Sequence, residues 1–140
     1  MGCLIGLDFG IKDSGIAITD QNQIIASPLD TCKTNRLISF LIKYDKNERV
    51  DAFVIGKPIQ KDGSPSDVEK EILEFIIKLK KNFPNKSIYR QDERYTSKIS
   101  ARVVLESGIK KNKRKNKRLI DKISATLILQ SYLEYKSKNS

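Results

Sequence analysis

The sequence predicts a single α/β domain over residues 1–140, built from a mixed sheet with helices packed on its faces. The chain has 140 residues, which is the size of one domain with one core. Short continuous apolar runs predict buried strands, and apolar residues at helical spacing predict the helices that cover them. The order of these patterns is β-β-β-α-β-α-β-α-α, which favours a mixed sheet.

The strands of the N-terminal half are the clearest elements. Residues 3–9 and 15–19 are apolar runs joined by a Gly-containing turn, and residues 24–26 are a third short run, so we expect an antiparallel meander. The apolar run at 52–55 ends at Gly56, a pattern typical of a strand covered on both faces.

Two helices of this half are predicted from their apolar periodicity and caps. Apolar residues recur at near-helical spacing over 34–47, with Thr34 or the residue after it as the cap. The Gly and Pro content of 57–65 predicts a loop. Ser66 then begins a helix, and Glu69 three residues later completes a capping box.

The C-terminal half continues with a strand and two helices. Residues 87–89 predict a short strand, and 96–106 predict a helix with Thr at its start. Seven of the nine side chains at 110–118 are basic, so this run predicts an exposed loop before a last helix at 119–135.

Charge and composition limit the class of function. Lys and Arg exceed Asp and Glu by 27 to 17, so the net charge is +10 and a polyanionic partner is favoured, nucleic acid above all. The absence of histidine excludes triads built on that residue and most zinc sites. Because we find no signal peptide and no apolar stretch long enough to span a bilayer, we expect a cytoplasmic protein with no membrane partner.

Asp8 is the most informative single residue. It ends an apolar strand whose alternating face carries Leu4 and Gly6, and a carboxylate at the margin of a buried strand must be paired, hydrogen-bonded or bound to a metal. Nothing adjacent in the sequence neutralises it.

Three further acids lie at the ends of other predicted buried elements. Asp121 shares one helix face with Ala125, Ile128 and Tyr132, and this face packs on the sheet. A structural explanation remains open, because Asp121 would also suit a helix N-terminus, and Asp92 and Glu93 would suit a solvated strand end. Acids on three buried elements would repel one another without a cation, and hard oxygen ligands favour Mg²⁺ or Mn²⁺.

Four segments resemble the YqgF (RuvX) family and together cover nearly the whole chain in order. They are residues 6–10 (GLDFG), 54–58 (VIGKP) with 62–64 (DGS), 92–96 (DERYT), and 121–125 (DKISA) through 129–132 (LQSY). The resemblance implies a ribonuclease-H-like α/β fold, a mixed sheet with helices on both faces. It implies a nuclease that processes the 5′ end of precursor 16S rRNA, and an older proposal for the family is a Holliday-junction resolvase.

By the same resemblance, Asp8, Glu93 and Asp121 would be the catalytic metal ligands, with Asp92 as the substitute for Glu93. The chain departs from the family after Lys12, where Asp13 stands in place of the usual Arg, and the usual Gly after the Asp-Gly-Ser turn is displaced by Pro65-Ser66. These departures affect the substrate loops and leave the three acids in place.

The expected chemistry is phosphodiester hydrolysis. Two divalent ions about 4 Å apart would activate a water and stabilise the leaving 3′ oxygen, with substrate phosphates and waters completing the ligand sets. The side chains expected to contact phosphates are Lys12, Lys57, Lys61, Lys110, Lys111, Lys113, Arg114, Lys115, Lys117 and Arg118. A solvated turn at 57–61 and a solubilising loop at 110–118 are the structural alternatives.

Three other functions compete with the rRNA nuclease. A resolvase-like DNA nuclease would cut branched DNA, and it would need a homodimer with two symmetric sites. The sequence shows no dimer surface, so both a monomer and a homodimer remain open. A non-catalytic RNA-binding module would be expected to lack some of the acids, yet all are present. An actin-like or sugar-kinase ATPase has a similar first loop, but it needs two related domains and the chain has the length of one.

Overall fold

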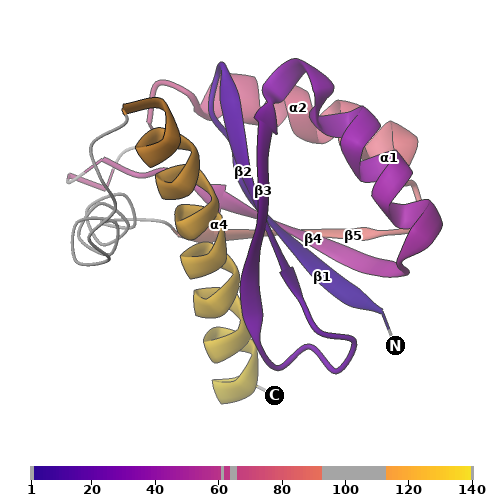
Figure 1. Ribbon diagram of the computed structural model, residues 1–140. Coiled ribbons are helices and arrows are strands. Elements are labelled where there is room, and N and C mark those ends of the chain that lie inside the picture. Colours follow the sequence, from indigo (N-terminus) through magenta and orange to yellow (C-terminus); the bar gives the residue numbers. More distant parts are fainter. Residues whose placement is uncertain (1, 61, 64–65, 93–112, 140) are drawn as a thin grey trace.

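A twisted five-stranded sheet forms the centre of the molecule in the computed structural model (Figure 1). The structure describes residues 2–60, 62–63, 66–92 and 113–139, and of residues 113–115 the backbone alone. The strands are β1 (Cys3–Asp8), β2 (Asp13–Thr19), β3 (Ala26–Lys33), β4 (Val50–Lys57) and β5 (Ser87–Asp92). Their order in the sheet is β3-β2-β1-β4-β5. The first three strands pair antiparallel and β4 and β5 add in parallel, so the predicted mixed sheet is confirmed.

Helices cover both faces of the sheet, because the two faces of each buried strand are apolar. The 3-10 helix η1 (Thr34–Arg36) leads into α1 (Leu37–Asn47), and α2 (Glu69–Asn82) lies beside α1. Both pack on the face that carries Ile5 and Leu7, whereas α4 (Lys113–Lys138) packs on the face of Leu4. Figure 1 shows α4 on one side of the strands and the other helices on the opposite side.

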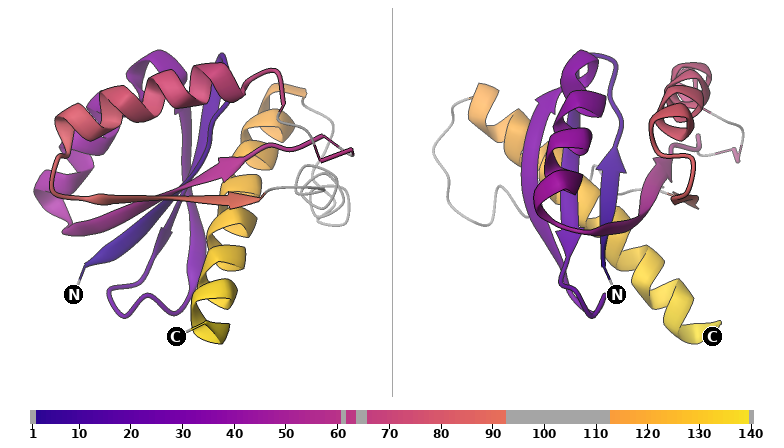
Figure 2. Two further views of the ribbon diagram at one scale, coloured as in Figure 1. Left: turned by 180° about the vertical axis from the view of Figure 1, so that it is seen from behind. Right: turned by 90° about the vertical axis from the view of Figure 1, so that its right-hand side faces the viewer.

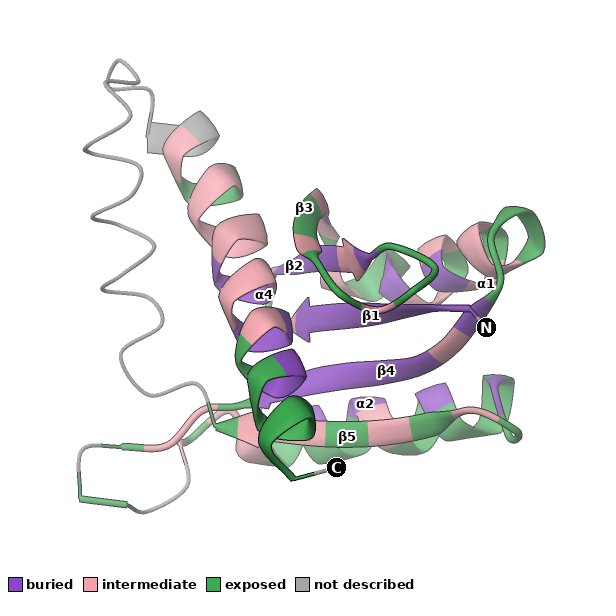
Figure 3. Cartoon of the chain, turned by 90° about the horizontal axis from the view of Figure 1, so that it is seen from below, coloured by how far each residue is buried: buried purple, intermediate pink, exposed green. Residues whose placement is uncertain are grey.

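The central strands are the most buried part of the sheet. Figure 3 shows β1 and β4 buried along most of their length, with α4 crossing the strand ends. The strand β5 is more exposed, and the left view of Figure 2 shows it at the near edge of the sheet with α2 above it. The central position of β1 means that any polar residue at its end lies within the fold and not at its margin.

One end of the sheet collects the ends of all five strands. Asp8 at the end of β1 lies opposite Gly15 of β2, and Asp13 at the start of β2 lies opposite Lys33 at the end of β3. The parallel pairing of β1, β4 and β5 brings Lys57 to the same end of the sheet. We call this end the acidic edge; it is the end of the sheet at which Asp8, Asp13 and Lys57 lie, and not one of its edge strands.

The third strand is longer than its sequence predicts. We expected residues 24–26, but β3 is Ala26–Lys33, and Ile24 and Ile25 lie in the preceding turn. Their backbone N–H groups donate to Asp20 Oδ1, each at 2.8 Å. The strand was missed because Pro28 and Asp30 interrupt the apolar pattern, and both are tolerated where β3 forms an edge of the sheet.

The basic run before the last helix was assigned wrongly. Residues 113–118 belong to α4 and are not a loop. Arg118 donates to the Thr31 carbonyl oxygen at 2.9 Å, and the Thr31 hydroxyl donates to the Arg118 carbonyl oxygen at 2.6 Å. Contacts to β3 therefore hold this end of the helix against the sheet despite its charge. The helix expected at 96–106 and residues 110–112 lie outside the described residues.

The second helix also begins differently from its prediction. It starts at Glu69 and not at Ser66, and no side-chain hydrogen bond caps it. Glu69 instead pairs with Arg90, as described below, so the capping box does not form. None of the described helices is long and apolar enough to cross a membrane.

Candidate active site

Asp8 lies on the α4 side of the acidic edge. It alternates along β1 with Leu4, which is in the core under α4, and with Gly6, where a Cβ atom would lie 2.7 Å from Leu129 Cβ. Because side chains alternate along a strand, Asp8 shares this face. The side chain is half-buried, as expected for a polar residue at the end of a central strand.

Asp121 is brought to the same place by α4. A Cβ atom on Gly15 would lie 1.9 Å from the Asp121 carbonyl oxygen, so α4 rests directly on the backbone of β2 at this point. Gly15 is also the strand partner of Asp8. The two acids therefore flank one glycine, Asp8 from the neighbouring strand and Asp121 from the helix above.

The surroundings of Asp121 disfavour its ionised form. Its side chain is 17% exposed, and its Oδ2 is buried without a hydrogen-bond donor among the described residues. Burial raises the pKa of this carboxyl, the charge of Lys117 opposes the rise, and the charge of Asp13 adds to it. The ammonium of Lys117 lies 3.8 Å from Oδ2 but is largely solvated, so it compensates little of the burial.

The position of Asp121 within α4 removes the simplest structural explanation for it. We considered that it stabilises a helix N-terminus, but α4 begins at Lys113, so Asp121 is more than two turns inside the helix. The favourable field of a helix end falls off within the first turn. The face predicted for this helix is confirmed, because Ala125, Ile128 and Tyr132 are buried against the sheet.

A hydroxyl network holds the turn that follows Asp8. The Ser14 and Thr34 hydroxyl oxygens are 2.7 Å apart, and Thr34 Oγ1 donates to the Gly10 carbonyl oxygen at 2.5 Å. The Gly10 N–H donates to Ser14 Oγ at 3.3 Å, and the Thr34 N–H donates to the Lys12 carbonyl oxygen at 2.9 Å. This network fixes the backbone of the β1–β2 turn, directly after Asp8. The sequence had predicted only a capping role for Thr34.

Hydrogen bonds of Arg90 connect the elements at the β4 and β5 part of the acidic edge. Arg90 of β5 makes two hydrogen bonds to the Glu69 carboxylate, at 2.7 and 3.1 Å, and donates to the Gly56 carbonyl oxygen at 3.1 Å. Charge-assisted bidentate pairs of this kind are strong and directional. Arg90 thereby ties α2 to the end of β4.

Only one member of the Asp92-Glu93 pair is described. Asp92 is exposed, and by alternation it shares the face of Ile88 and Arg90, which is the α2 side of the sheet. Glu93 lies outside the described residues. Among the residues that the structure does describe, no three acidic or cysteine side chains are grouped so that they could hold a metal ion.

One acid near this edge was not singled out in the sequence. Asp13 starts β2 on the same strand face as Gly15, and its charge contributes to the raised pKa of Asp121. The sequence did mark Asp13 as a departure from the family, which usually has Arg at this position. We related this departure only to the substrate loops and not to the acidic site.

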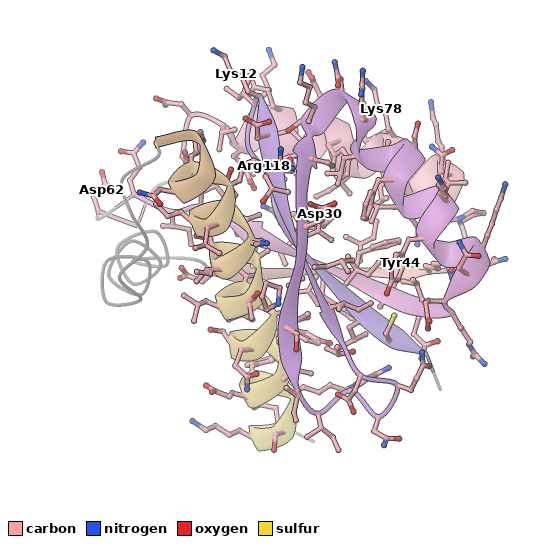
Figure 4. The ribbon with its side chains drawn as sticks, in the orientation of Figure 1. Lys12, Asp30, Tyr44, Asp62, Lys78 and Arg118 are labelled. Carbon is pink, nitrogen blue, oxygen red and sulfur yellow. The ribbon has the colours of Figure 1, made fainter. Side chains whose placement is uncertain are left out.

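The predicted phosphate contacts are distributed around the acidic edge. Lys12 is exposed in the β1–β2 turn, and Lys57 is exposed at the end of β4. Figure 4 labels Lys12 at the top of the view and Arg118 and Asp30 beside the upper half of β3. The backbone of Lys113, Arg114 and Lys115 forms the start of α4. Lys61, Lys110 and Lys111 lie outside the described residues.

The fold defines the class of protein. The structure is similar over 97% of this chain to that of Thermus thermophilus RuvC, with a TM-score of 0.57, 13% identity and 96% of that chain covered. The T. thermophilus RuvC complex with a Holliday junction substrate gives a TM-score of 0.55 at 15% identity, with 96% of each chain covered. The expected ribonuclease-H-like fold is confirmed.

Sequence comparison then gives the family. Residues 2–135 match the RuvX family, described as Holliday junction resolvase, and the chain belongs to it. A protein of Flavobacterium psychrophilum named "Putative pre-16S rRNA nuclease" is 47% identical over 133 residues, which are 95% of this chain and 97% of that protein. A Bacteroides fragilis protein of the same name is 45% identical over 136 residues, 97% of this chain and 99% of its own length.

Proposed function

We propose that this chain is a divalent-metal-dependent endonuclease that processes the 5′ end of precursor 16S rRNA. Its full-length similarity to relatives named for this activity supports the substrate. The observation that carries the chemistry is the buried Oδ2 of Asp121, which accepts no hydrogen bond from the described residues and is held over Gly15 beside Asp8. An ionised carboxylate at this position is favoured by a nearby positive charge, and the solvated ammonium of Lys117 is a weak partner.

The donor set fits Mg²⁺ or Mn²⁺. Asp8 and Asp121 offer hard carboxylate oxygens on two rigid elements, and Glu93 is the proposed third ligand. The α2-side position of Asp92 favours Glu93 over Asp92 for this role, since Asp8 and Asp121 lie on the α4 side. Bound divalent ions would supply an activated water and stabilise the leaving 3′ oxygen. The protein contributes the fixed positions of the carboxylates, through Gly15, Ser14 and Thr34.

Nucleic acid as the partner agrees with the charge of the molecule. The net charge is +10, and exposed Lys12 and Lys57 flank the acidic edge from two turns. Cations around a carboxylate site let a phosphate chain approach acids that would otherwise repel it.

A Holliday-junction resolvase is the second candidate. It is favoured by the description of the RuvX family and by the similar fold of RuvC, which was solved with a junction substrate. Such an enzyme would act as a dimer, because two symmetric cuts need two sites. A non-catalytic RNA-binding module is less well supported, because Asp8, Glu93 and Asp121 are all retained.

One experiment separates these functions. The purified protein is incubated with a precursor 16S rRNA fragment and with a four-way DNA junction, each with Mg²⁺, Mn²⁺ or EDTA. We expect metal-dependent cleavage of the RNA at one position and little cutting of the junction. The reverse preference would favour the resolvase, and binding without cleavage in both metals would favour the binding module.

The Asp8→Asn substitution tests the site within the same experiment. Because it removes a charged ligand and keeps the shape, cleavage is expected to fall at least about 100-fold while the protein remains folded. The matched control is Glu134→Gln, an exposed acid on α4 that lies 13 residues beyond Asp121, a distance of about 20 Å along the helix. Cleavage at the normal rate by folded Asp8→Asn protein would rule out the proposed metal site.

A further inference from the structure

A groove beside the acidic edge includes charged residues, Lys33 and Arg36, that the proposed function has not used so far. It has a volume of about 820 Å³ and runs between β3, η1 and the first turns of α4. We call it the β3–α4 groove and define it by its charged residues, which are Asp13, Asp30, Lys33, Arg36, Lys117 and Arg118. We propose that the β3–α4 groove binds the phosphate backbone of one nucleic-acid strand as it leaves the acidic edge. This inference rests on the proposed function.

The groove starts at the acidic site. Asp13 lies on the same face of β2 as Gly15, against which Asp121 packs, and it is the strand partner of Lys33. Asp8 is level with Gly15 and Thr31 in the sheet, so Lys33 lies two strand spacings across and two residues along the strand from Asp8, about 12 Å away. At roughly 3.4 Å for each stacked nucleotide, this is the length of three to four nucleotides.

Two of the four cations form ion pairs within the protein. The guanidinium of Arg118 lies 3.8 Å from Asp30, and the ammonium of Lys117 lies 3.8 Å from Asp121. Lys33 and Arg36 are exposed and form no ion pair with another described residue. These two side chains therefore remain available to contact phosphates.

The walls of the groove are held in place before any ligand binds. The two hydrogen bonds between Thr31 and Arg118 lock α4 to β3, and Thr31 is buried. Thr34, the first residue of η1, follows Lys33 directly, and its hydroxyl donates a hydrogen bond to the Gly10 carbonyl oxygen. A preformed groove keeps the backbone that carries Lys33 and Arg36 in a fixed position relative to the acids, which lowers the entropy cost of ordering a phosphate chain.

The substitution to test is Lys33→Gln with Arg36→Gln, since both side chains are exposed and form no ion pair with another described residue. The control is Lys43→Gln with Lys81→Gln, which removes the same charge from α1 and α2 on the opposite face of the sheet. All binding measurements use the Asp8→Asn background so that the RNA stays intact. The melting temperature of each variant is measured alongside.

The probes are two single-stranded RNAs whose cleaved phosphate, mapped with the unaltered protein, lies near the 5′ end in one and near the 3′ end in the other. We expect the groove variant to bind one of them about tenfold more weakly and the other almost normally, because the groove extends from one side of the site. Its log-affinity against log-salt slope should fall by about 1.4 for the affected RNA, corresponding to two phosphate contacts. The control variant should lose much less.

The outcomes separate this inference from the proposed function. If the unaltered protein cleaves RNA but the groove variant matches its control, the groove is not a nucleic-acid path and the nuclease assignment stands. Equal losses with both RNAs would show a general charge effect and would also overturn the inference. Effective competition by polyglutamate at concentrations that match RNA would identify an acidic peptide as the occupant. If the unaltered protein neither binds nor cleaves RNA, the proposed function fails first.

Discussion

At the scale of single residues, Asp121 gives the molecule a pH-dependent weakness. The fold raises the pKa of this carboxyl above its value in the unfolded chain, mainly by burial. The native state therefore binds the proton more tightly, and stability is lost as the pH rises through the folded pKa. Above the folded pKa, burial of this carboxylate therefore lowers the stability of the metal-free protein.

The Asp121→Asn substitution tests this weakness. In EDTA near pH 7, the variant should melt at a temperature equal to or above that of the unaltered protein, and the advantage should shrink as the pH is lowered toward 4. Added Mg²⁺ or Mn²⁺ should raise the melting temperature of the unaltered protein and not that of the variant, because a ligand stabilises only the state that binds it. Equal metal-induced stabilisation of both proteins would contradict a role for Asp121 in holding the metal.

Residues on regular elements were easier to predict than residues that act through the turns. The face of Asp8 follows from the alternation of Leu4 and Gly6, and the face of Asp121 follows from helical spacing. The Thr34 contact to Gly10 joins residues 24 positions apart, and no local pattern encodes such a contact. The same limit applies to Asp13, whose closeness to Asp121 depends on how α4 docks.

At the scale of elements, the docking of α4 on β2 determines the geometry of the candidate site. Small residues permit it, because Gly15 contacts the Asp121 backbone and Gly6 lies against Leu129 and Ala125. The sequence predicted the apolar face of this helix but not its start. Hydrogen bonds to β3 at Thr31, 87 residues away, extend the helix into a basic run that resembles a loop when its sequence is considered alone.

The Gly15→Ala substitution should disturb both stability and the site. The added Cβ would lie 1.9 Å from the Asp121 carbonyl oxygen, so α4 must move outward. Overpacking of this kind costs roughly 1–3 kcal/mol, measurable by urea unfolding. Metal-dependent cleavage should fall with it. The comparison is Gly6→Ala, which presses on Leu129 two turns further along α4 and should lose stability with less effect on metal-induced stabilisation.

At the scale of the whole molecule, a locally acidic site lies in a protein whose net charge is +10, so the charge of the site is opposite to that of its surroundings. The acids lie between elements at one end of the sheet, while the cations lie on the turns and helix starts around them. The order of strands was predictable only as a mixed sheet, because the pairing of β4 with both β1 and β5 depends on contacts between segments distant in sequence. The distribution of charge followed from the sequence more directly, since exposed basic runs cannot pack in a core.

The basic run at the start of α4 provides the last prediction. Its residues lie on a helix and not on a mobile loop, so the charges of Lys113, Arg114 and Lys115 are carried by an ordered backbone. Replacing all three by Ala keeps the helix propensity and should weaken RNA binding at low salt, with the log-affinity against log-salt slope reduced by about 2–3, roughly one for each lost phosphate contact. Single-turnover cleavage at saturating protein should change much less, because Asp8 and Asp121 are unaltered. An unchanged affinity and salt slope in the triple variant would mean that the RNA does not follow this end of α4 and that the charge there serves only solubility.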